Sequence, residues 1–275
     1  MFRKSIYKTP AQLRLMLDAG RLTEAALDAV RAEIRPGVTT LELDAIAERT
    51  IRAGGGRPNF QLVPGYSHTI CASVGADVVH GIPNDRPLEP GDIVSIDCGA
   101  DVGGWNGDSA FTVVLDDPER PEEVAARRRL SEVTESSLWA GIARLARATS
   151  LNEVGESVQE AIESRGDYGI LTDYIGHGIG RSMHEAPPVF NYRVAHKGPD
   201  VKPGLAVAIE PMVVAGDPET FVQDDDWTVT TVDGSMASHW EHSVAVHADG
   251  IWVLTASDGG AAGLAPFGVA PTPMG

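Results

Sequence analysis

The sequence has few cysteines, few aromatic residues and little positive charge. Its 275 residues include two cysteines, Cys71 and Cys98, which excludes a disulfide framework and favours a reducing compartment such as the cytoplasm. Lys and Arg number 22 against 39 Asp and Glu, and the net charge of −17 argues against binding to nucleic acid or to anionic membranes, because both need a basic surface. No apolar run approaches the roughly 18 residues of a transmembrane helix, and the N-terminal segment lacks the apolar stretch of a signal peptide.

The chain has ample apolar sequence for a large core, with 43% hydrophobic residues in a pattern of alternating helices and strands. Thr9 is the predicted N-cap of a helix that begins at Pro10, and a second helix begins near Thr40 and ends at the glycines from Gly54. Two more helices are predicted at 121–147 and 151–164. Strands are predicted at 69–79, at 92–114 as a hairpin, and at 205–214, 227–232, 240–246 and 251–254.

Helix pairs separated by antiparallel hairpins indicate an α+β fold, with the helices packed on one face of a sheet. Three apolar positions of the second helix recur in the fourth at a constant offset of 111 residues, which indicates a duplicated helix–helix–strand unit. These positions are Leu43, Ala47 and Ile51, which match Val154, Val158 and Ile162.

One domain is predicted over residues 1–256, with halves at about 8–116 and 121–256 that are joined by an acidic connection. The remaining segment, 257–275, consists mostly of Gly, Ala and Pro. Such a segment buries little apolar surface, so we expect it to be poorly ordered.

Two aspartates of the predicted hairpin point to one spot. If the turn lies between Gly103 and Gly104, Asp97 faces Ala110, and Asp108 lies on the same side of the sheet because it is two residues from Ala110. Both carboxylates could be solvated on an exposed face. The apolar residues directly before Asp97 favour burial instead, and a buried carboxylate needs a partner.

Two glutamates and one histidine stand in equally apolar or confined settings. Glu210 interrupts the least polar strand, which contains no Arg or Lys to pair with it, and Glu241 follows Trp240 in another apolar strand. His177 lies among three glycines, which allow close backbone approach, although a flexible turn would have the same composition. Four clustered carboxylates would repel one another, whereas two divalent cations would balance them. Oxygen ligands with one imidazole suit Mn²⁺, Fe²⁺, Co²⁺ or Zn²⁺, so the hypothesis is a dinuclear site that activates water.

These residues stand in an ordered series of motifs that resembles the type I methionine aminopeptidases of the pita-bread metallopeptidase fold. The resemblance runs from about Lys8 to Leu254. It implies a curved antiparallel sheet with two helix pairs on its outer face and pseudo-twofold halves. It also implies removal of the N-terminal Met from new polypeptides, preferably before a small second residue. The motifs are 78–83, 91–97, 107–108, 176–181, 184–185, 209–212 and 241–242.

The resemblance also implies a ligand set for two divalent ions, which would be Co, Mn, Fe or Zn. Asp97 and Asp108 would bind both ions together with Glu241, which bridges them. His177 and Glu210 would complete the shell of one ion.

Catalytic and substrate-binding roles follow from the same resemblance. Glu210 would take the proton from the attacking water and pass it on, His184 would contact the scissile amide and stabilise the oxyanion, and His80 would lie near the substrate's amino end or the leaving nitrogen. The methionine pocket would be lined by Tyr66, Cys71, Met183, Trp227 and Phe60. For the pocket residues, ordinary core packing is the alternative.

Two other functions remain open at this point. A broader or X-Pro dinuclear aminopeptidase would cleave Ala-Pro rather than Met-Ala peptides. A non-catalytic binding module of this fold would lose metal ligands, whereas all five are present here. The resemblance further implies a cytoplasmic monomer that acts on nascent polypeptides, with transient ribosome contact. Residues 127–129, three consecutive arginines, are a candidate contact patch or simply a solvated helix face.

Overall fold

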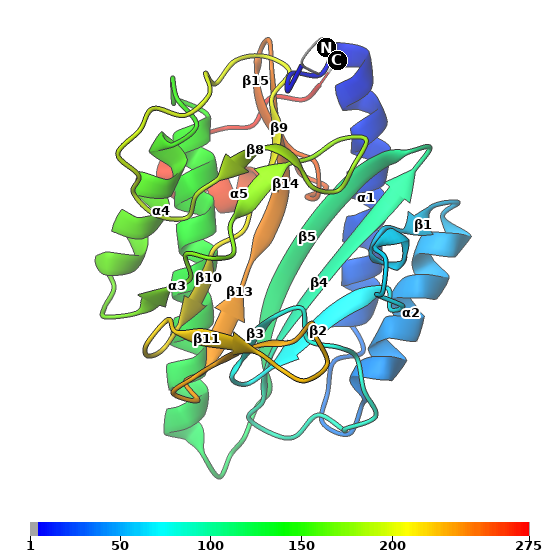
Figure 1. Ribbon diagram of the computed structural model, residues 1–275, viewed down its shortest axis with the longest axis vertical. Coiled ribbons are helices and arrows are strands. Elements are labelled where there is room, and N and C mark those ends of the chain that lie inside the picture. Colours follow the sequence, from blue (N-terminus) through cyan, green and yellow to red (C-terminus); the bar gives the residue numbers. More distant parts are fainter. Residues whose placement is uncertain (1–4, 275) are drawn as a thin grey trace.

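The structure, a computed structural model, describes residues 5–274 and is built around a curved antiparallel sheet with nine strands (Figure 1). These strands are β1 (Arg57–Pro58), β2 (Ile70–Val74), β4 (Ile93–Val102), β5 (Trp105–Val114), β7 (Gly176–Gly178), β8 (Glu185–Val189), β9 (Ala206–Ile209), β14 (Glu241–His247) and β15 (Gly250–Val253). Their order is β1-β4-β5-β14-β9-β7-β8, with β2 beside β4 and β15 beside β14. The two halves of the chain therefore meet where β5 pairs with β14.

Two small sheets flank the large one. The first contains β3 (Asp77–Val79), β11 (Thr220–Val222) and β12 (Val229–Thr231), and the second contains β6 (Gly169–Ile170), β10 (Met212–Val214) and β13 (Ala237–His239). Each predicted strand region contains strands of the structure, although several regions divide into two. The short strands β1, β6, β7, β8, β11 and β13 lie outside the predicted ones, because two to five residues carry too little alternation to be recognised.

Four long helices form two pairs behind the sheet, on opposite sides of the view in Figure 1. Helix α1 (Pro10–Arg31) packs on α2 (Thr40–Ala53) and on β4 and β5, and α3 (Pro121–Leu145) packs on α4 (Glu153–Glu163). Thr9 and Thr39 each form a capping box with the residue three positions on, so the starts of α1 and α2 are determined locally. The six matched apolar positions of α2 and α4 are all fully buried. The predicted α+β architecture is thus confirmed.

No helix within residues 5–274 combines the length and the apolar character needed to cross a bilayer.

The C-terminal segment differs from the sequence-based expectation. It forms the helical turns α5 (Ala261–Leu264) and η2 (Ala265–Phe267), and Leu264 is fully buried in the core beneath α3. A Cβ on Gly263 would lie 2.1 Å from the Trp139 ring, so the small residues of this segment permit close packing. Near its end, the Thr272 N–H donates to the Ile251 carbonyl at 3.0 Å. The composition of the segment did not predict this packing, because a single apolar side chain among many small residues anchors the segment to the core.

Leu264→Ala is expected to lower the free energy of unfolding by about 2–5 kcal/mol, because it removes a fully buried side chain and leaves a cavity. Denaturant unfolding of the variant and the parent measures this difference. Leu62→Ala is the matched control, since Leu62 is 52% exposed and should change stability by less than about 0.5 kcal/mol. Equal small effects of the two substitutions would contradict the packed arrangement.

Candidate metal centre

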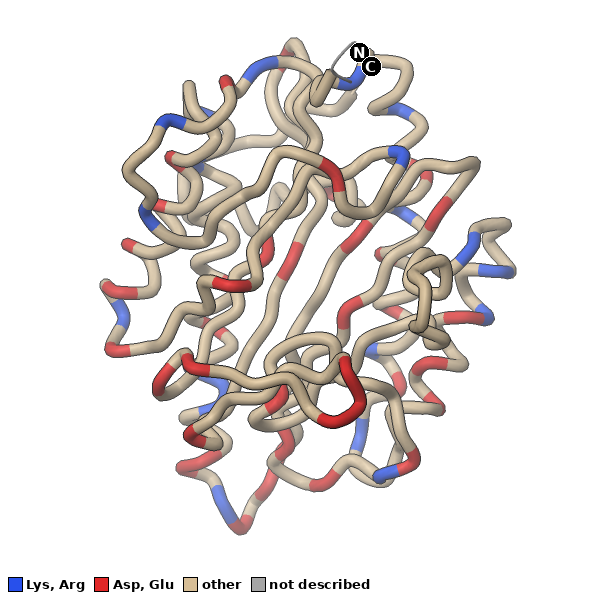
Figure 2. Tube along the Cα trace, viewed as in Figure 1, with Lys and Arg blue, Asp and Glu red and all other residues tan. Residues whose placement is uncertain are grey.

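Five adjacent strands bring the five predicted ligands together. Asp97 lies on β4, Asp108 on β5, Glu241 on β14, Glu210 directly after β9, and His177 on β7. These strands are consecutive neighbours in the sheet, and acidic segments of neighbouring strands lie at its middle in Figure 2. Residues up to 144 positions apart in the chain (97 to 241) therefore meet through strand order.

The register of the central strands places the carboxylates on one face. Asp97 and Glu241 both stand opposite Ala110, from the strands on either side of it. Asp108 is two residues from Ala110, so its side chain points to the same face. The hairpin register predicted from the Gly103-Gly104 turn is confirmed, since the pairing of Asp97 with Ala110 is the predicted one.

The glycines around His177 are required by close packing. A Cβ on Gly176 would lie 2.4 Å from the Ala208 carbonyl oxygen, and one on Gly178 would lie 2.2 Å from the Ala186 carbonyl oxygen. Strand β7 therefore fits between β9 and β8 only with glycine at these two positions. The segment is a tightly held strand, and the alternative of a flexible turn is excluded.

Burial and mutual repulsion shape the acid–base properties of the carboxylates. Burial raises the pKa of Asp97 to about 8. Burial, and then repulsion by neighbouring carboxylates, raises the pKa of Asp108, Glu210 and Glu241 well above the usual range. One oxygen each of Asp97, Asp108 and Glu241 is buried with no hydrogen-bond partner in the described structure. Such oxygens are costly unless a cation or a proton satisfies them.

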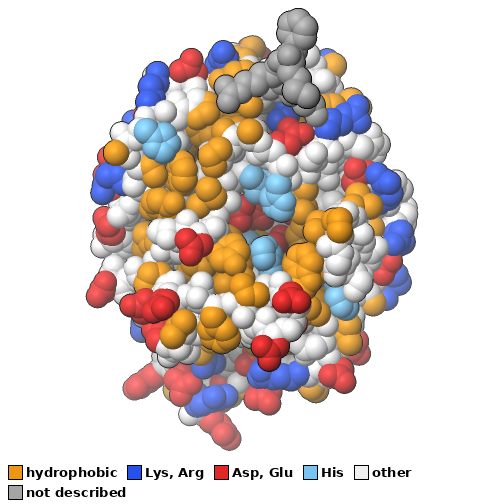
Figure 3. All heavy atoms as spheres, viewed as in Figure 1, with side chains coloured by type: hydrophobic (Ala, Val, Ile, Leu, Met, Phe, Trp, Pro, Cys, Tyr) orange, Lys and Arg blue, Asp and Glu red, His pale blue; other side chains and the backbone are white. Residues whose placement is uncertain are grey.

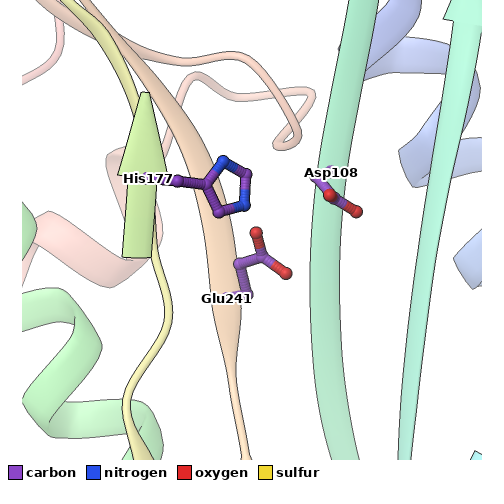
Figure 4. Close-up of side chains that lie close together, drawn as sticks. All are labelled: Asp108, His177 and Glu241. Atoms are coloured by element: carbon purple, nitrogen blue, oxygen red, sulfur yellow. The ribbon is translucent and has the colours of Figure 1, made fainter. Parts of the chain in front are cut away.

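The arrangement fits divalent cations. Asp108, His177 and Glu241 each offer one ligand atom, and these atoms lie within 4.8 Å of one another, facing a common space (Figure 4). Nδ1 of His177 lies 3.0 Å from the Gly178 carbonyl oxygen and donates to it, so Nε2 keeps a free lone pair. Burial, reinforced by nearby His184, lowers the pKa of His177 to about 4, which keeps the imidazole neutral, as a metal ligand must be. Nε2 also lies 3.4 Å from Glu210 Oε1.

One cavity of about 120 Å³ contains every site residue predicted from the sequence and its resemblance. The space-filling view shows this hollow at the centre of one face, with histidines at its edge and acidic atoms below them (Figure 3). The lining described here contains no Lys or Arg that could neutralise the carboxylates. The predicted residues that line it are Phe60, Tyr66, Cys71, His80, Asp97, Asp108, His177, Met183, His184, Glu210, Trp227 and Glu241.

One end of the cavity is apolar and well fixed. Phe60, Tyr66 and Cys71 form a buried cluster against which Met183 and Trp227 pack. The Tyr66 and Trp227 rings pack edge to face with their centres 5.0 Å apart. The Tyr66 hydroxyl donates a hydrogen bond of 2.7 Å to the Ile70 carbonyl oxygen. Aromatic and sulfur-containing walls of this kind suit an unbranched, polarisable side chain.

Two further histidines border the carboxylates. His80 has a φ of 59°, in the left-handed region that a non-glycine residue rarely adopts and that is often found at functional sites. Burial lowers the pKa of His80 to about 4 and lowers that of His184. The centres of the His184 and His177 rings lie 4.3 Å apart. Both side chains are neutral near pH 7 and can donate hydrogen bonds to a substrate.

His239 lies beside Glu210 at the edge of the site, and the sequence analysis did not identify it. It is 1% exposed at the end of β13, and its Nε2 lies 3.8 Å from Glu210 Oε2 with no hydrogen-bond partner among the described residues. Its position two residues before Glu241 places it on the same side under strand alternation, a signal that could have found it. Val63 and Val79 line the cavity and are not among the predicted site residues, since a valine side chain alone does not distinguish a pocket wall from the core.

Comparison with known proteins agrees with the metal site that the geometry indicates. The sequence model of metallopeptidase family M24 matches residues 14–248, most of the chain. This chain belongs to metallopeptidase family M24. It is thus an enzyme that hydrolyses peptide bonds.

The M24 chain is similar along nearly its whole length to curated relatives. It is 45% identical to methionine aminopeptidase 1 of Mycobacterium tuberculosis, over 90% of this chain and 94% of that protein. It is 40% identical to methionine aminopeptidase 1 of Bacillus subtilis, over 91% of this chain and 98% of that protein.

Solved structures agree with this similarity. A methionine aminopeptidase from Thermotoga maritima superposes with a TM-score of 0.84 at 36% identity, covering 93% of this chain and 99% of that chain. A prolidase from Pyrococcus furiosus shares the fold at 22% identity with a TM-score of 0.70, over 92% of this chain and 66% of that one. The expected pita-bread fold is confirmed by the first of these matches.

Proposed function

We propose that this M24 metallopeptidase is a methionine aminopeptidase. It removes the N-terminal Met from peptides and nascent polypeptides, preferably before a small second residue, and it uses two divalent ions from among Co, Mn, Fe and Zn. The observation that carries the proposal is one cavity in which four carboxylates and a neutral imidazole adjoin a fixed apolar pocket. The names of the relatives that match most of the chain support it.

The chain's own residues can divide the work of peptide hydrolysis. Metal ions held by the five candidate ligands, Asp97, Asp108, His177, Glu210 and Glu241, would lower the pKa of a bound water and polarise the scissile carbonyl. Glu210 takes the proton of the attacking water on its carboxylate and delivers it to the leaving amine. The neutral imidazole of His184 donates a hydrogen bond to the oxyanion, and His80 binds near the substrate's amino end or leaving nitrogen. The pocket of Tyr66 and its neighbours holds the methionine side chain.

The proposal extends to the cellular setting. The enzyme acts in the cytoplasm as a monomer in protein maturation, with transient contact to the ribosome. Arg127 pairs with Glu123 at 3.4 Å and Arg128 pairs with Asp116, so neighbouring acids offset much of the candidate basic patch. Such a patch supports brief encounters rather than stable docking.

Metal-stripped protein that is resupplied with each ion in turn tests the function. Met-Ala-Ser should release free Met in a metal-dependent way, whereas Met-Leu-Ser and Ala-Pro-Ser should be poor substrates. Cleavage of Ala-Pro-Ser in place of Met-Ala-Ser would assign an X-Pro peptidase instead. No cleavage with any ion, by protein that remains folded, would overturn the proposal in favour of a binding module.

A further inference from the structure

A second, open groove of about 580 Å³ adjoins the metal cavity. The two spaces share Val63, Met183 and His184 as walls, so a polypeptide whose first residues occupy the cavity can continue into the groove past His184. The groove also contains Arg57 and Arg181, and Asp101 is its one carboxylate in the described lining. It therefore carries net positive charge on a protein whose own net charge is −17.

Arg181 is held in place by the β4–β5 hairpin. Its guanidinium lies 4.4 Å from the centre of the Trp105 ring, and Nη1 donates to the carbonyl oxygens of Gly103 and Gly104, each at 3.2 Å. A Cβ on Gly104 would lie 2.8 Å from Nη1, so glycine at this turn leaves the space that the guanidinium fills. Within residues 5–274, Nε and Nη2 of Arg181 make no hydrogen bond, and no carboxylate pairs with it. The guanidinium thus presents free donors from a fixed position.

The loop that carries Arg181 also carries the groups beside the scissile bond. The Asn106 backbone N–H and the Asn106 side chain both donate to the Gly180 carbonyl oxygen, at 2.9 and 3.0 Å. The Ser182 N–H donates to Glu185 Oε1 at 3.0 Å. These bonds fix the loop on both sides of Arg181, so its charge keeps a constant position relative to His184.

The other arginine of the groove is already neutralised. Arg57 pairs with Asp101 at 3.0 Å, and that carboxylate is largely buried. The uncompensated charge of the groove is therefore that of Arg181. A planar guanidinium with two free edge nitrogens is well suited to a carboxylate.

We propose that the polypeptide downstream of the scissile bond lies in this groove and that Arg181 binds an acidic side chain there. This inference rests on the proposed function and narrows its substrate class. The preferred substrates begin with Met and a small residue and carry Asp or Glu a few residues later. Arg181 acts on binding and positioning, and it takes no part in the chemistry.

Matched peptides test the inference. In a series with the frame Met-Ala-Ser-Ser-Ser-Ser, one Glu or one Lys replaces the third, fourth, fifth or sixth residue in turn, and kcat/KM for Met release is measured at low and high salt. At one or two adjacent positions the Glu peptide should exceed the Lys peptide by about 3- to 10-fold at low salt, and high salt should reduce this ratio. The ratio within each enzyme variant is the readout, so changes in overall activity cancel.

Two variants locate the effect. Arg181→Gln should bring the Glu-to-Lys ratio of kcat/KM close to one, and Arg181→Lys should retain part of the wild-type ratio. Arg193→Gln is the control, because it removes the same charge from an exposed arginine that pairs with Glu156 and Glu160. A wild-type ratio near one at every position, or a ratio that survives Arg181→Gln, would overturn the inference while Met release itself continues. Absence of Met release from all peptides would instead overturn the proposed function.

Discussion

Glu210→Gln is expected to lower kcat for Met-Ala-Ser by about 10²–10⁴-fold, because the amide cannot accept and return the proton of the attacking water. Glu210 is buried, and its Oε1 lies 3.4 Å from His177 Nε2. KM should change much less than kcat, since the substitution leaves intact the apolar pocket that we propose holds the substrate side chain. Steady-state release of free Met, with metal content measured on the same samples, gives both constants and the occupancy.

A matched control separates proton transfer from loss of charge. Glu132→Gln also removes one carboxylate, but Glu132 is exposed on α3 and outside the cavity, so activity should be unchanged. If Glu210→Gln at full metal content retained activity within a factor of about ten, the assigned proton transfer would be wrong.

The metal-free protein is expected to become less stable as the pH rises from about 6.5 to about 8. The pKa of Asp97 is raised to about 8 in the folded state, and those of Asp108, Glu210 and Glu241 are raised as well, chiefly by burial. The buried histidines have lowered pKa values and act in the opposite sense below about pH 6.5, but above that pH they are neutral in both states. Between about pH 6.5 and about pH 8 the folded protein therefore binds more protons than the unfolded chain, whose carboxyls titrate near pH 4. Their stability contribution is fully present below the unfolded pKa and is lost as the pH rises through the folded pKa, by an amount on the order of several kcal/mol.

Thermal unfolding in chelator across this pH range measures the loss. A divalent ion should restore stability at the high end, because metal binds the deprotonated ligands. Asp108→Asn is the informative variant: it removes one of the repelling carboxylates, so at about pH 8 it should be more stable than the metal-free parent yet gain less from added metal. A midpoint independent of pH in chelator, or equal stabilisation of both proteins by metal, would contradict the assigned electrostatics.

The features that the sequence predicted correctly are those decided by interactions between residues near in the chain. The cap at Thr9, the turn at Gly103-Gly104 and the register of Asp97 depend on residues near one another in the sequence. They could be predicted because the interactions that decide them lie within one helix start or one hairpin. The residues of the methionine pocket could be proposed only from the resemblance to a known family. No local sequence pattern distinguishes them from residues of the hydrophobic core.

The sequence by itself determined the helices, the central hairpin and the chemical identity of the five candidate ligands. Only the tertiary structure decided that β4, β5, β14, β9 and β7 are neighbours, which is what makes those ligands one site. It also decided that His239 lies beside Glu210, that Leu264 anchors the C-terminal segment, and that Arg181 lies in the groove without a carboxylate partner among the described residues. The physical reason is the same in each case: the contacts join segments far apart in the chain, and their energies depend on burial and strand order that no short window of sequence contains.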